Sequence, residues 1–396
     1  MFVDYKYKKP IIVVEIGCNH KGDLEIAKEM IRVAKECGAD VAKFQKRCNK
    51  ELLTEEQYNA PHPNPINAYG KTYGEHREFL EFSVEQHKIL KECCENYGIE
   101  YSTSVWDLTS AKEITSLKPK MIKIPSACNN HFEMLGWLCE NYDGEIHVST
   151  GMTTSEEVEN IVKFFESKKR EKDLVLYACT SGYPVPYEDV CLLEIRTLCE
   201  KYGNRVKKIG FSGHHINTAT DVAAFVLGAE VIERHFTLCK QWKGTDHAAS
   251  LEPSGLKQLV DDLNNTFKSL TFKNNSLLEI EKIQRKKLKY KKGYIVSKEL
   301  TLKDAMHLIN QNQQGFIFVE DADNRVVGIL TDGDIRRALL NGASLCSKNN
   351  EWMNKDFVYV SEQYLPDELD KIFEDNKIKF VPVLNDSGHL VDIIIR

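Results

Sequence analysis

The sequence lacks the features that would place the chain in a membrane or direct it out of the cell. No apolar run approaches the ~20 residues that a membrane-spanning helix needs. The first residues, Met1 to Lys6, contain no apolar core of a signal peptide. Cys-x-x-Cys zinc pairs are absent, and many of the 12 cysteines fall in expected helices, where cysteine behaves as a small buried hydrophobe. We therefore expect a reducing, cytoplasmic environment.

The chain also lacks a strong excess of one charge. Its 53 lysines and arginines and 59 aspartates and glutamates give a formal net charge of −6, and both signs are mixed along the sequence. This balance gives no reason to expect nucleic acid or a membrane surface as the main partner. One basic stretch, from Glu281 to Lys292, is short, and we expect it to form a linker helix or a solvated arm rather than a nucleic-acid contact.

What the sequence has in abundance is alternation between short β-rich runs and helical patterns, in which apolar residues recur three and four positions apart. This alternation predicts a parallel sheet, and eight units in about 270 residues match a (β/α)8 barrel. An open doubly wound sheet is the structural alternative, but it rarely needs eight regular units. The expected strands are Ile11–Ile16, Asp40–Gln45, Ile99–Ser104, Met121–Pro125, Glu145–Ser149, Leu174–Cys179, Lys207–Phe211 and Val231–Arg234.

Two segments break this pattern. The segment from Lys46 to Phe82 is longer than a usual loop and is rich in proline, so we expect a functional loop over the barrel mouth. After the barrel (1–272) and a linker (273–293), residues 294–396 contain an internal repeat. Phe316-Ile317-Phe318-Val319 and Phe380-Val381-Pro382-Val383 each precede a tight turn and a second strand. Two such halves side by side predict a small α+β module.

Polar residues recur at the ends of the expected strands. In a parallel barrel these ends converge on one face. Lysines with hydroxyl groups there predict a site for phosphate or carboxylate. Any one of these residues alone would be expected to be structural, so the recurrence carries the prediction. The residues are Glu15, Lys43, Gln45, Ser102, Thr103, Ser104, Lys123, Ser126, Ser149, Thr150, Thr180, Ser181, Tyr183, Ser212, His214 and His235.

His214 and His235 end adjacent strands, and this placement favours metal ligation over a structural role. Two imidazoles with few carboxylates allow Mn²⁺, Zn²⁺, Fe²⁺ or Co²⁺. With two protein ligands, water and substrate must fill the remaining positions, and such an open site acts as a Lewis acid. Asp246 could hold the substrate or a metal-bound water, whereas His215 and His247 are weaker candidates.

The barrel resembles the sialic acid (N-acetylneuraminate, or nonulosonate) synthase family from about Ile11 to about Leu270. The motifs that carry the resemblance occur in order, and several are closer to the animal-type than to the common bacterial-type members. They are Glu15-Ile16-Gly17-Cys18-Asn19-His20-Lys21-Gly22, Ala42-Lys43-Phe44-Gln45, Gly70-Lys71-Thr72-Tyr73-Gly74-Glu75-His76, Ser149-Thr150-Gly151-Met152, Cys179-Thr180-Ser181-Gly182-Tyr183-Pro184, Phe211-Ser212-Gly213-His214, Glu233-Arg234-His235-Phe236 and Trp242-Lys243-Gly244-Thr245-Asp246-His247.

This resemblance implies an enzyme that condenses phosphoenolpyruvate with an N-acetylmannosamine-type aldose, with or without a 6-phosphate. The products would be a nine-carbon 2-keto-3-deoxy acid and phosphate. It implies that His214 and His235 bind a divalent metal, with Mn²⁺ expected and Mg²⁺ or Co²⁺ as alternatives, and that Glu15 handles water or cationic charge. Phosphoenolpyruvate would contact Lys43, Thr103, Lys123, Ser126, Ser149, Ser181 and Ser212, and the sugar would contact Gln45, Tyr183 and Asp246.

The chain departs from the family at its C-terminal end. The family's antifreeze-like domain, which reaches across a dimer with an arginine, has no counterpart here, and the repeat instead resembles a CBS-domain pair. Thr331 and Asp334 match positions that contact a nucleotide ribose, so an adenine nucleotide is an expected partner, while packing without a ligand is an equal alternative. Inside the barrel, Ser181 and Gly213 replace the Asn and Asp of many bacterial members. We expect a homo-oligomer.

Three other functions are alternatives for this chain. A related 3-deoxy-ulosonate synthase would use a different aldose. An inosine-monophosphate dehydrogenase type of enzyme also combines a barrel with CBS repeats, but it needs a catalytic cysteine loop that this chain does not display. A non-catalytic nucleotide sensor with a vestigial barrel is the third alternative. The combination of Lys43, Lys123, His214 and His235 argues against it.

Overall fold

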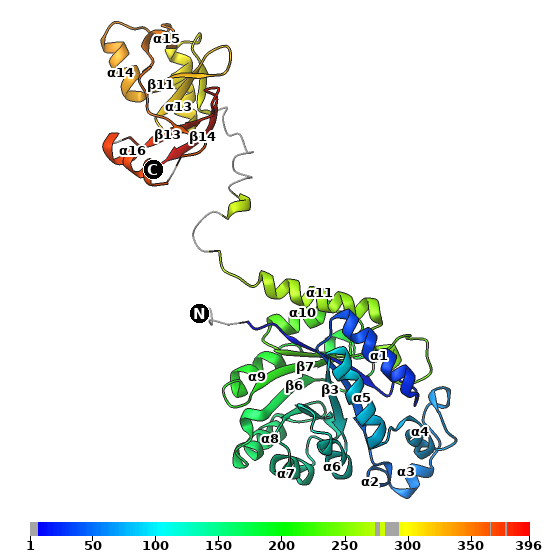
Figure 1. Cartoon of the computed structure of the whole chain (residues 1–396). Helices are drawn as coiled ribbons and strands as arrows, with labels where there is room; N and C mark the ends of the chain where they lie inside the picture. The colour runs from blue at the N-terminus through cyan, green and yellow to red at the C-terminus, as the bar shows by residue number, and fades with distance from the viewer. Residues whose placement is uncertain (1–6, 274–277, 282–292, 365, 377) are drawn as a thin grey trace. The chain divides into compact units, whose positions relative to one another are not determined.

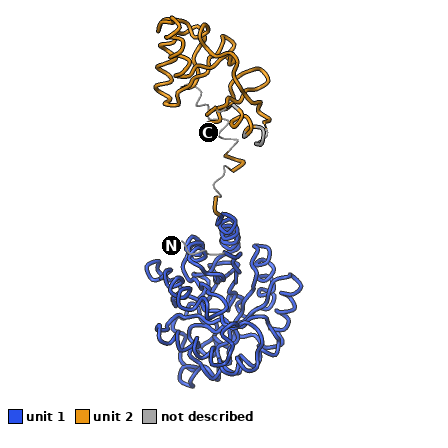
Figure 2. Tube along the Cα trace, turned by 90° about the vertical axis from the view of Figure 1, so that its left-hand side faces the viewer, with its two compact units in different colours: residues 1–271 blue, residues 272–396 orange. Residues whose placement is uncertain are grey.

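The computed structural model describes residues 7–273, 278–281, 293–364, 366–376 and 378–396. The chain divides into two compact units, residues 1–271 and 272–396, which Figure 2 distinguishes by colour. Most of the predicted linker, including the basic stretch 282–292, lies outside the described residues. Within the described part of the chain, every helix is too short or too polar to cross a bilayer.

The first unit is a closed barrel of parallel strands in which each strand pairs with its neighbours in chain order and β1 pairs with β8. This confirms the predicted (β/α)8 barrel (Figure 1). The strands are β1 (Ile11–Gly17), β2 (Val41–Lys46), β3 (Glu100–Val105), β4 (Met121–Ile124), β5 (Glu145–Ser149), β6 (Leu174–Cys179), β7 (Lys208–Gly213) and β8 (Val231–His235).

The helices that follow the strands surround the barrel and cover its outer face (Figure 1). They are α1 (Leu24–Cys37), α5 (Val84–Tyr97), α6 (Leu108–Ser116), α7 (Phe132–Asn141), α8 (Ser155–Ser167), α9 (Glu194–Tyr202), α10 (Ala219–Val226) and α11 (Pro253–Ser269). Local chemistry sets the ends of α1: the Asp23 side chain accepts from the first backbone N–H groups, and Gly38 closes the helix with a φ of 94°.

Alternation along each strand decides which residues face the barrel interior. Val13, Val41, Tyr177 and Val231 pack together there, apart from the larger core between strands and helices. Residues two positions further along a strand therefore also point inward. Glu15 follows Val13 in this way and lies in register with both Lys43 and His235. The interior is thus apolar at one end and polar toward the carboxyl ends of the strands.

The predicted functional loop, residues 46–82, is folded rather than irregular. It contains α2 (Asn49–Leu52), α3 (Glu55–Asn59), the 3₁₀ turn η1 (Pro65–Asn67) and α4 (Tyr73–Leu80). Thr54 and Thr72 begin α3 and α4 with reciprocal capping boxes, which is why these short helices start where they do.

The second unit consists of two similar halves, as the repeat predicts. Its sheets have the strand orders β11-β10-β9 and β12-β13-β14. Equivalent residues of the two halves meet: the rings of Phe316 and Phe380 stack with centroids 3.5 Å apart, and Arg325 pairs with His389. Its elements are β9 (Ile295–Ser297), α13 (Leu302–Asn312), β10 (Phe316–Glu320), β11 (Val326–Thr331), α14 (Asp332–Leu340), α15 (Asn349–Trp352), β12 (Val360–Ser361), α16 (Pro366–Asn376), β13 (Phe380–Leu384) and β14 (Leu390–Ile395).

Candidate active site

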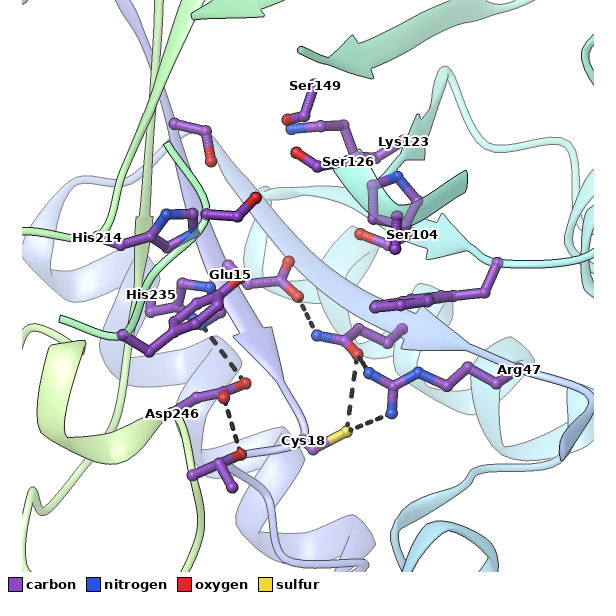
Figure 3. Close-up of a pocket in the computed structure, with 18 of the residues that line it drawn as sticks. Glu15, Cys18, Arg47, Ser104, Lys123, Ser126, Ser149, His214, His235 and Asp246 are labelled. Atoms are coloured by element: carbon purple, nitrogen blue, oxygen red, sulfur yellow. Dashed lines mark hydrogen bonds and ion pairs between the residues drawn. The ribbon is translucent and has the colours of Figure 1, made fainter. Parts of the chain in front are cut away.

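A cavity of about 470 Å³ lies at the carboxyl ends of the barrel strands, within the size range of ligand sites. Of the barrel residues to which the family resemblance gives a catalytic or binding role, all but one line this cavity; Ser102, Thr150 and Thr180 from the longer strand-end list do not line it. Those that line it are Glu15, Lys43, Gln45, Lys123, Ser126, Ser149, Ser181, Tyr183, Ser212, His214, His235 and Asp246 (Figure 3 labels several). Residues from β1 to β8 and from the segments that follow them therefore converge, although they are far apart in the sequence.

The exception is Thr103, which the structure places outside the cavity. Thr103 is fully buried, and its hydroxyl donates to the hydroxyl of Tyr101 at 2.6 Å. Both residues lie on the outward row of β3, facing the helices. Ser104, one residue later, lies on the inward row and accepts a hydrogen bond from Lys43 Nζ at 2.8 Å. A shift of one residue along a strand exchanges the two faces of the sheet, so the inward hydroxyl here is that of Ser104.

The floor of the cavity is a buried cluster of two lysines and two glutamates. Lys123 Nζ donates to both carboxylate oxygens of Glu233 at 2.9 Å and lies 3.7 Å from the centroid of the Tyr177 ring. Lys43 forms an ion pair with Glu15 and lies 3.7 Å from Glu233. The cluster is therefore electrically balanced by the protein itself.

The charges in this cluster determine one another's protonation. Burial alone would raise the pKa of Glu233, but Lys123 and Lys43 outweigh burial and hold that pKa well below its usual range. Burial lowers the pKa of Lys123, and Glu233 opposes that fall. Burial also acts against the charged form of Lys43, but Glu15 and Glu233 raise its pKa overall. Glu233 is therefore a carboxylate.

Sequence reasoning missed Glu233 as a site residue, although it is part of a quoted motif. It lies two positions before His235 on β8, so strand alternation places both side chains on the same inward row. Ser212 Oγ donates to Glu233 Oε1 at 3.0 Å, which links this carboxylate to the hydroxyl row.

His214 and His235 lie together on another side of the cavity, with ring centroids 5.3 Å apart (Figure 3). The carbonyl oxygen of Thr180 accepts from His214 Nδ1 at 3.0 Å, so the lone pair of that ring is on Nε2. Burial and the neighbouring His235 lower the pKa of His214 to about 3, so the ring is neutral near pH 7. Tyr183 packs against both rings, with centroid distances of 4.4 and 5.6 Å.

The donor set of this pair fits a metal ion with an open coordination sphere. His235 Nδ1 is buried and has no hydrogen-bond partner among the described residues, and Asp246 Oδ2 lies 3.9 Å from it. No group of three or more His, Cys, Asp or Glu side chains in the described part of the chain is arranged to hold a metal. If an ion binds here, the two imidazoles would be the protein's ligands and water or substrate would supply the others.

The segment 46–82 supplies a further wall that sequence reasoning did not assign. Arg47, His62, Tyr73, His76 and Arg77 line the cavity from this segment. The prolines indicated an ordered, functional loop, but nothing in their pattern indicates which of its side chains turn inward. For Arg47 a signal was available: a charged residue that follows an inward residue of β2 by two positions is expected on the same inward row.

In the second unit, the predicted nucleotide-contacting residues bond to each other. Thr331 Oγ1 donates to Asp334 Oδ2 at 2.6 Å, and Asp334 N donates back to Thr331 Oγ1 at 3.1 Å. This reciprocal pair begins α14 as a capping box. The structure thus gives Thr331 and Asp334 a helix-capping role, and their contact with a nucleotide stays a prediction.

Comparison with known proteins connects both units to characterised families. The model of the NeuB family matches residues 30–275, and the model of the CBS domain matches residues 290–341 and 350–396. The N-acetylneuraminate-9-phosphate synthase of Homo sapiens is 38% identical over 282 residues, which cover 70% of this chain and 76% of that protein. The N,N'-diacetyllegionaminic acid synthase of Legionella pneumophila is 35% identical over 64% of this chain and 70% of its own length.

Comparison with solved structures also finds a sialic acid synthase. The N-acetylneuraminic acid (sialic acid) synthetase of Leptospira borgpetersenii, in complex with citrate, superposes with a TM-score of 0.60 at 26% identity. The match covers 72% of this chain and 94% of that one. The resemblance carried by the strand-end motifs is therefore confirmed at the level of the family, together with the CBS pair in the C-terminal unit.

Proposed function

We propose a reaction for this chain from one premise: the chain belongs to the NeuB family. Its barrel condenses phosphoenolpyruvate with the open-chain aldehyde of an N-acetylmannosamine-type aldose. C3 of phosphoenolpyruvate forms a bond to the aldehyde carbon, water adds to C2, and the C2–O bond to phosphate breaks. The products are a nine-carbon 2-keto-3-deoxy acid and inorganic phosphate. The names of the human and Legionella relatives support this sialic-acid-synthase-like role.

The observation that carries the proposal is the convergence of two different half-sites in one cavity. Two buried lysines with a row of serine hydroxyls lie on one side, and two imidazoles with a tyrosine lie on the other. The first set matches an anionic substrate, and the second matches a polarised carbonyl. A condensation between a phosphorylated enol and an aldehyde needs both.

Lys43 and Lys123 bind the phosphate and carboxylate of phosphoenolpyruvate, assisted by hydroxyls of the inward rows. Ser212 donates to Glu233 and can transfer that hydrogen bond to the ligand, whereas Ser104 accepts from Lys43 and can offer its own O–H to the ligand. Ser126 and Ser181 approach Gly151 closely, because a Cβ built there would lie 2.6 and 2.5 Å from their hydroxyl oxygens. Only glycine leaves that corner free for a ligand oxygen.

His214 and His235 would hold a divalent ion, Mn²⁺ by family resemblance, which would supply Lewis-acid polarisation of the aldehyde oxygen. Tyr183 packs against both imidazoles and fixes their orientation. Gln45 and Asp246 hold sugar hydroxyls at the rim. Asp246 is suited to this as a carboxylate, because His235 and Thr245 overcome burial and lower its pKa.

In the proposed reaction, Glu15 acts on the water that adds at C2. Its carboxylate pairs with Lys43, and its Oε1 accepts from Gln45 Nε2 at 2.8 Å. A carboxylate between the anion-binding lysine and the sugar-binding amide can accept a proton from that water, and its negative charge stabilises positive charge at C2.

The test is phosphate release by the purified full-length chain with phosphoenolpyruvate, MnCl₂ and N-acetylmannosamine, with and without a 6-phosphate. We expect turnover that EDTA abolishes and MnCl₂ restores. His214→Ala and His235→Ala should each lower kcat at least about 100-fold and lose bound Mn²⁺ in paramagnetic resonance titrations. Release with a different aldose only would favour a related 3-deoxy-ulosonate synthase. No release with any aldose would exclude the synthase reaction.

A further inference from the structure

Two arginines in the cavity wall lack an ion-pair partner among the described residues, although Glu81 and Asp246 lie near enough to Arg47 to help raise its pKa. Arg47 and Arg77 both pack on Trp106, with their guanidinium carbons 4.4 and 5.7 Å from the ring centroid. Within the described residues neither forms an ion pair with a carboxylate, whereas Lys43 and Lys123 on the floor both do. The guanidinium groups donate to neutral acceptors, and the carboxylate of Glu81 accepts from the backbone N–H of Arg47, at 2.8 Å, and not from its guanidinium.

The donors of these arginines are only partly used. Arg47 is 92% buried, yet its Nε has no hydrogen-bond partner among the described residues, and its terminal nitrogens donate to Gln45 and Cys18. Arg77 donates from Nε to Tyr73 Oη at 3.0 Å. Burial and the charge of Arg47 lower the pKa of Arg77, whereas Glu81 and Asp246 help to raise the pKa of Arg47, so Arg77 is the less compensated cation of the two.

Two histidines of the same segment, His62 and His76, add N–H donors to the cavity wall. His62 Nδ1 accepts from the backbone N–H of Asn64 at 3.0 Å, and His76 Nδ1 accepts from that of Tyr69 at 3.2 Å. Each ring therefore carries its proton on Nε2. Both residues line the same cavity, and their rings lie 4.3 Å apart.

Gln45 connects this wall to the floor of the site. Its Nε2 donates to Glu15, and its Oε1 accepts from Arg47 (Figure 3). In that view His214 and His235 lie on one side of Glu15 and Arg47 on the other. A sugar whose aldehyde is at the histidines and whose hydroxyls contact Gln45 would thus extend toward the arginines.

We propose that Arg47 and Arg77, with the Nε2 donors of His62 and His76, form a second anion subsite that binds a phosphate at the end of the acceptor remote from its aldehyde. This inference rests on the proposed function and narrows it to a phosphorylated aldose. Guanidinium groups match phosphate oxygens in pairs, and a dianion neutralises both arginines at once. An uncharged aldose leaves both unpaired.

The test compares N-acetylmannosamine 6-phosphate with N-acetylmannosamine in full-length wild type, Arg77→Gln, Arg77→Lys and Arg196→Gln. We expect wild type to prefer the phosphorylated acceptor in kcat/KM. Arg77→Gln should reduce the ratio of the two kcat/KM values about 10- to 100-fold, mainly through KM, and Arg77→Lys should reduce it less. Arg196, an exposed arginine of α9, provides the matched loss of charge and should leave the ratio unchanged.

Calorimetric titration separates failure of the inference from failure of the reaction. Sugar phosphate should bind wild type at least about 10-fold more tightly than Arg77→Gln, even if neither acceptor is turned over. An unaltered ratio and unaltered affinity in Arg77→Gln would overturn the subsite while leaving the synthase reaction intact. An equal rise in KM for phosphoenolpyruvate would assign the arginines to that substrate and would also overturn it. Melting curves identify any variant that fails to fold.

Discussion

Glu233 is the residue on which the buried charges of the floor converge. It accepts from Lys123 and Ser212 and lies near Lys43, so one carboxylate contributes to the charge balance of two lysines. Removing one partner from such a buried set is costly, because the remaining cations lose both solvent and counter-charge.

Glu233→Gln should therefore lower the free energy of unfolding by about 3–5 kcal/mol, since the amide keeps the shape but not the charge. Millimolar phosphate or phosphoenolpyruvate should recover part of this loss, because an anion that binds only the folded state stabilises it. Urea unfolding with and without each anion measures both effects.

Glu145→Gln is the control for this charge loss. Glu145 pairs with Lys207, Lys208 and His147 at the opposite ends of the strands and is more exposed, so the loss should be smaller than that of Glu233→Gln and insensitive to added anion. Equal destabilisation of the two variants, with equal response to phosphate, would contradict the role assigned to the floor cluster.

The sequence was sufficient to predict which strand ends meet at the cavity, but not every side chain that lines it. Strand ends identified Lys43, Lys123 and the two histidines, because apolar runs mark where each strand stops. Distinguishing Ser104 from Thr103 required the pleat of β3, which a run containing three hydroxyl residues does not reveal. Arg47 and Arg77 required the tertiary fold of segment 46–82.

At the scale of elements, the packing of α3 against α4 positions the part of the cavity wall that carries Arg77. Gly74 of α4 packs directly against the ring of Tyr58 of α3, and a Cβ at Gly74 would overlap that ring. Because α4 also carries His76 and Arg77, the packing of these two helices sets the position of the proposed phosphate subsite.

Gly74→Ala should push α4 away from α3. We expect KM for the acceptor to rise by about 10-fold or more and KM for phosphoenolpyruvate to rise less, because small displacements of binding groups weaken binding. Steady-state kinetics with each substrate varied in turn measures the difference. Gly136→Ala on α7 is the matched change, since its Cβ would meet Phe164 at an ordinary 3.4 Å. A similar rise in both KM values, or none, would contradict this role of α4.

At the scale of the whole molecule, the chain joins a catalytic type of barrel to a CBS pair whose ligand is a prediction. The second unit offers an internal comparison for that prediction. Thr301 and Asp304 begin α13 with a capping box whose hydroxyl-to-carboxylate distance, 2.6 Å, equals that of Thr331 and Asp334 at α14. Only the second pair lies in the motif that resembles a nucleotide site.

Asp334→Asn and Asp304→Asn should lower the melting temperature of the full-length chain by similar small amounts, because each keeps an acceptor oxygen for its capping box but loses a negative charge in the first helical turn. Only Asp334→Asn should weaken the binding of AMP or ATP in calorimetric titrations. Equal binding by both variants, or no binding by wild type, would leave Asp334 with capping as its sole role.

The architecture of the two units was predictable because it follows from periodicity, and the repeat even indicated which residues are equivalent. Phe316 and Phe380 occupy equivalent places in the repeat, and their stacking shows that the halves face each other across equivalent strands. The chemistry inside the barrel was less predictable, since it depends on which residue of each alternating pair points inward.

The charge balance of the floor has a consequence for turnover. If Lys43 and Lys123 bind the substrate phosphate as proposed, Glu233 occupies the same ammonium groups in the empty site and would compete with every incoming anion. Such competition weakens the binding of inorganic phosphate as well as that of phosphoenolpyruvate. The carboxylate would therefore lower the affinity for substrate and also increase the rate at which inorganic phosphate dissociates.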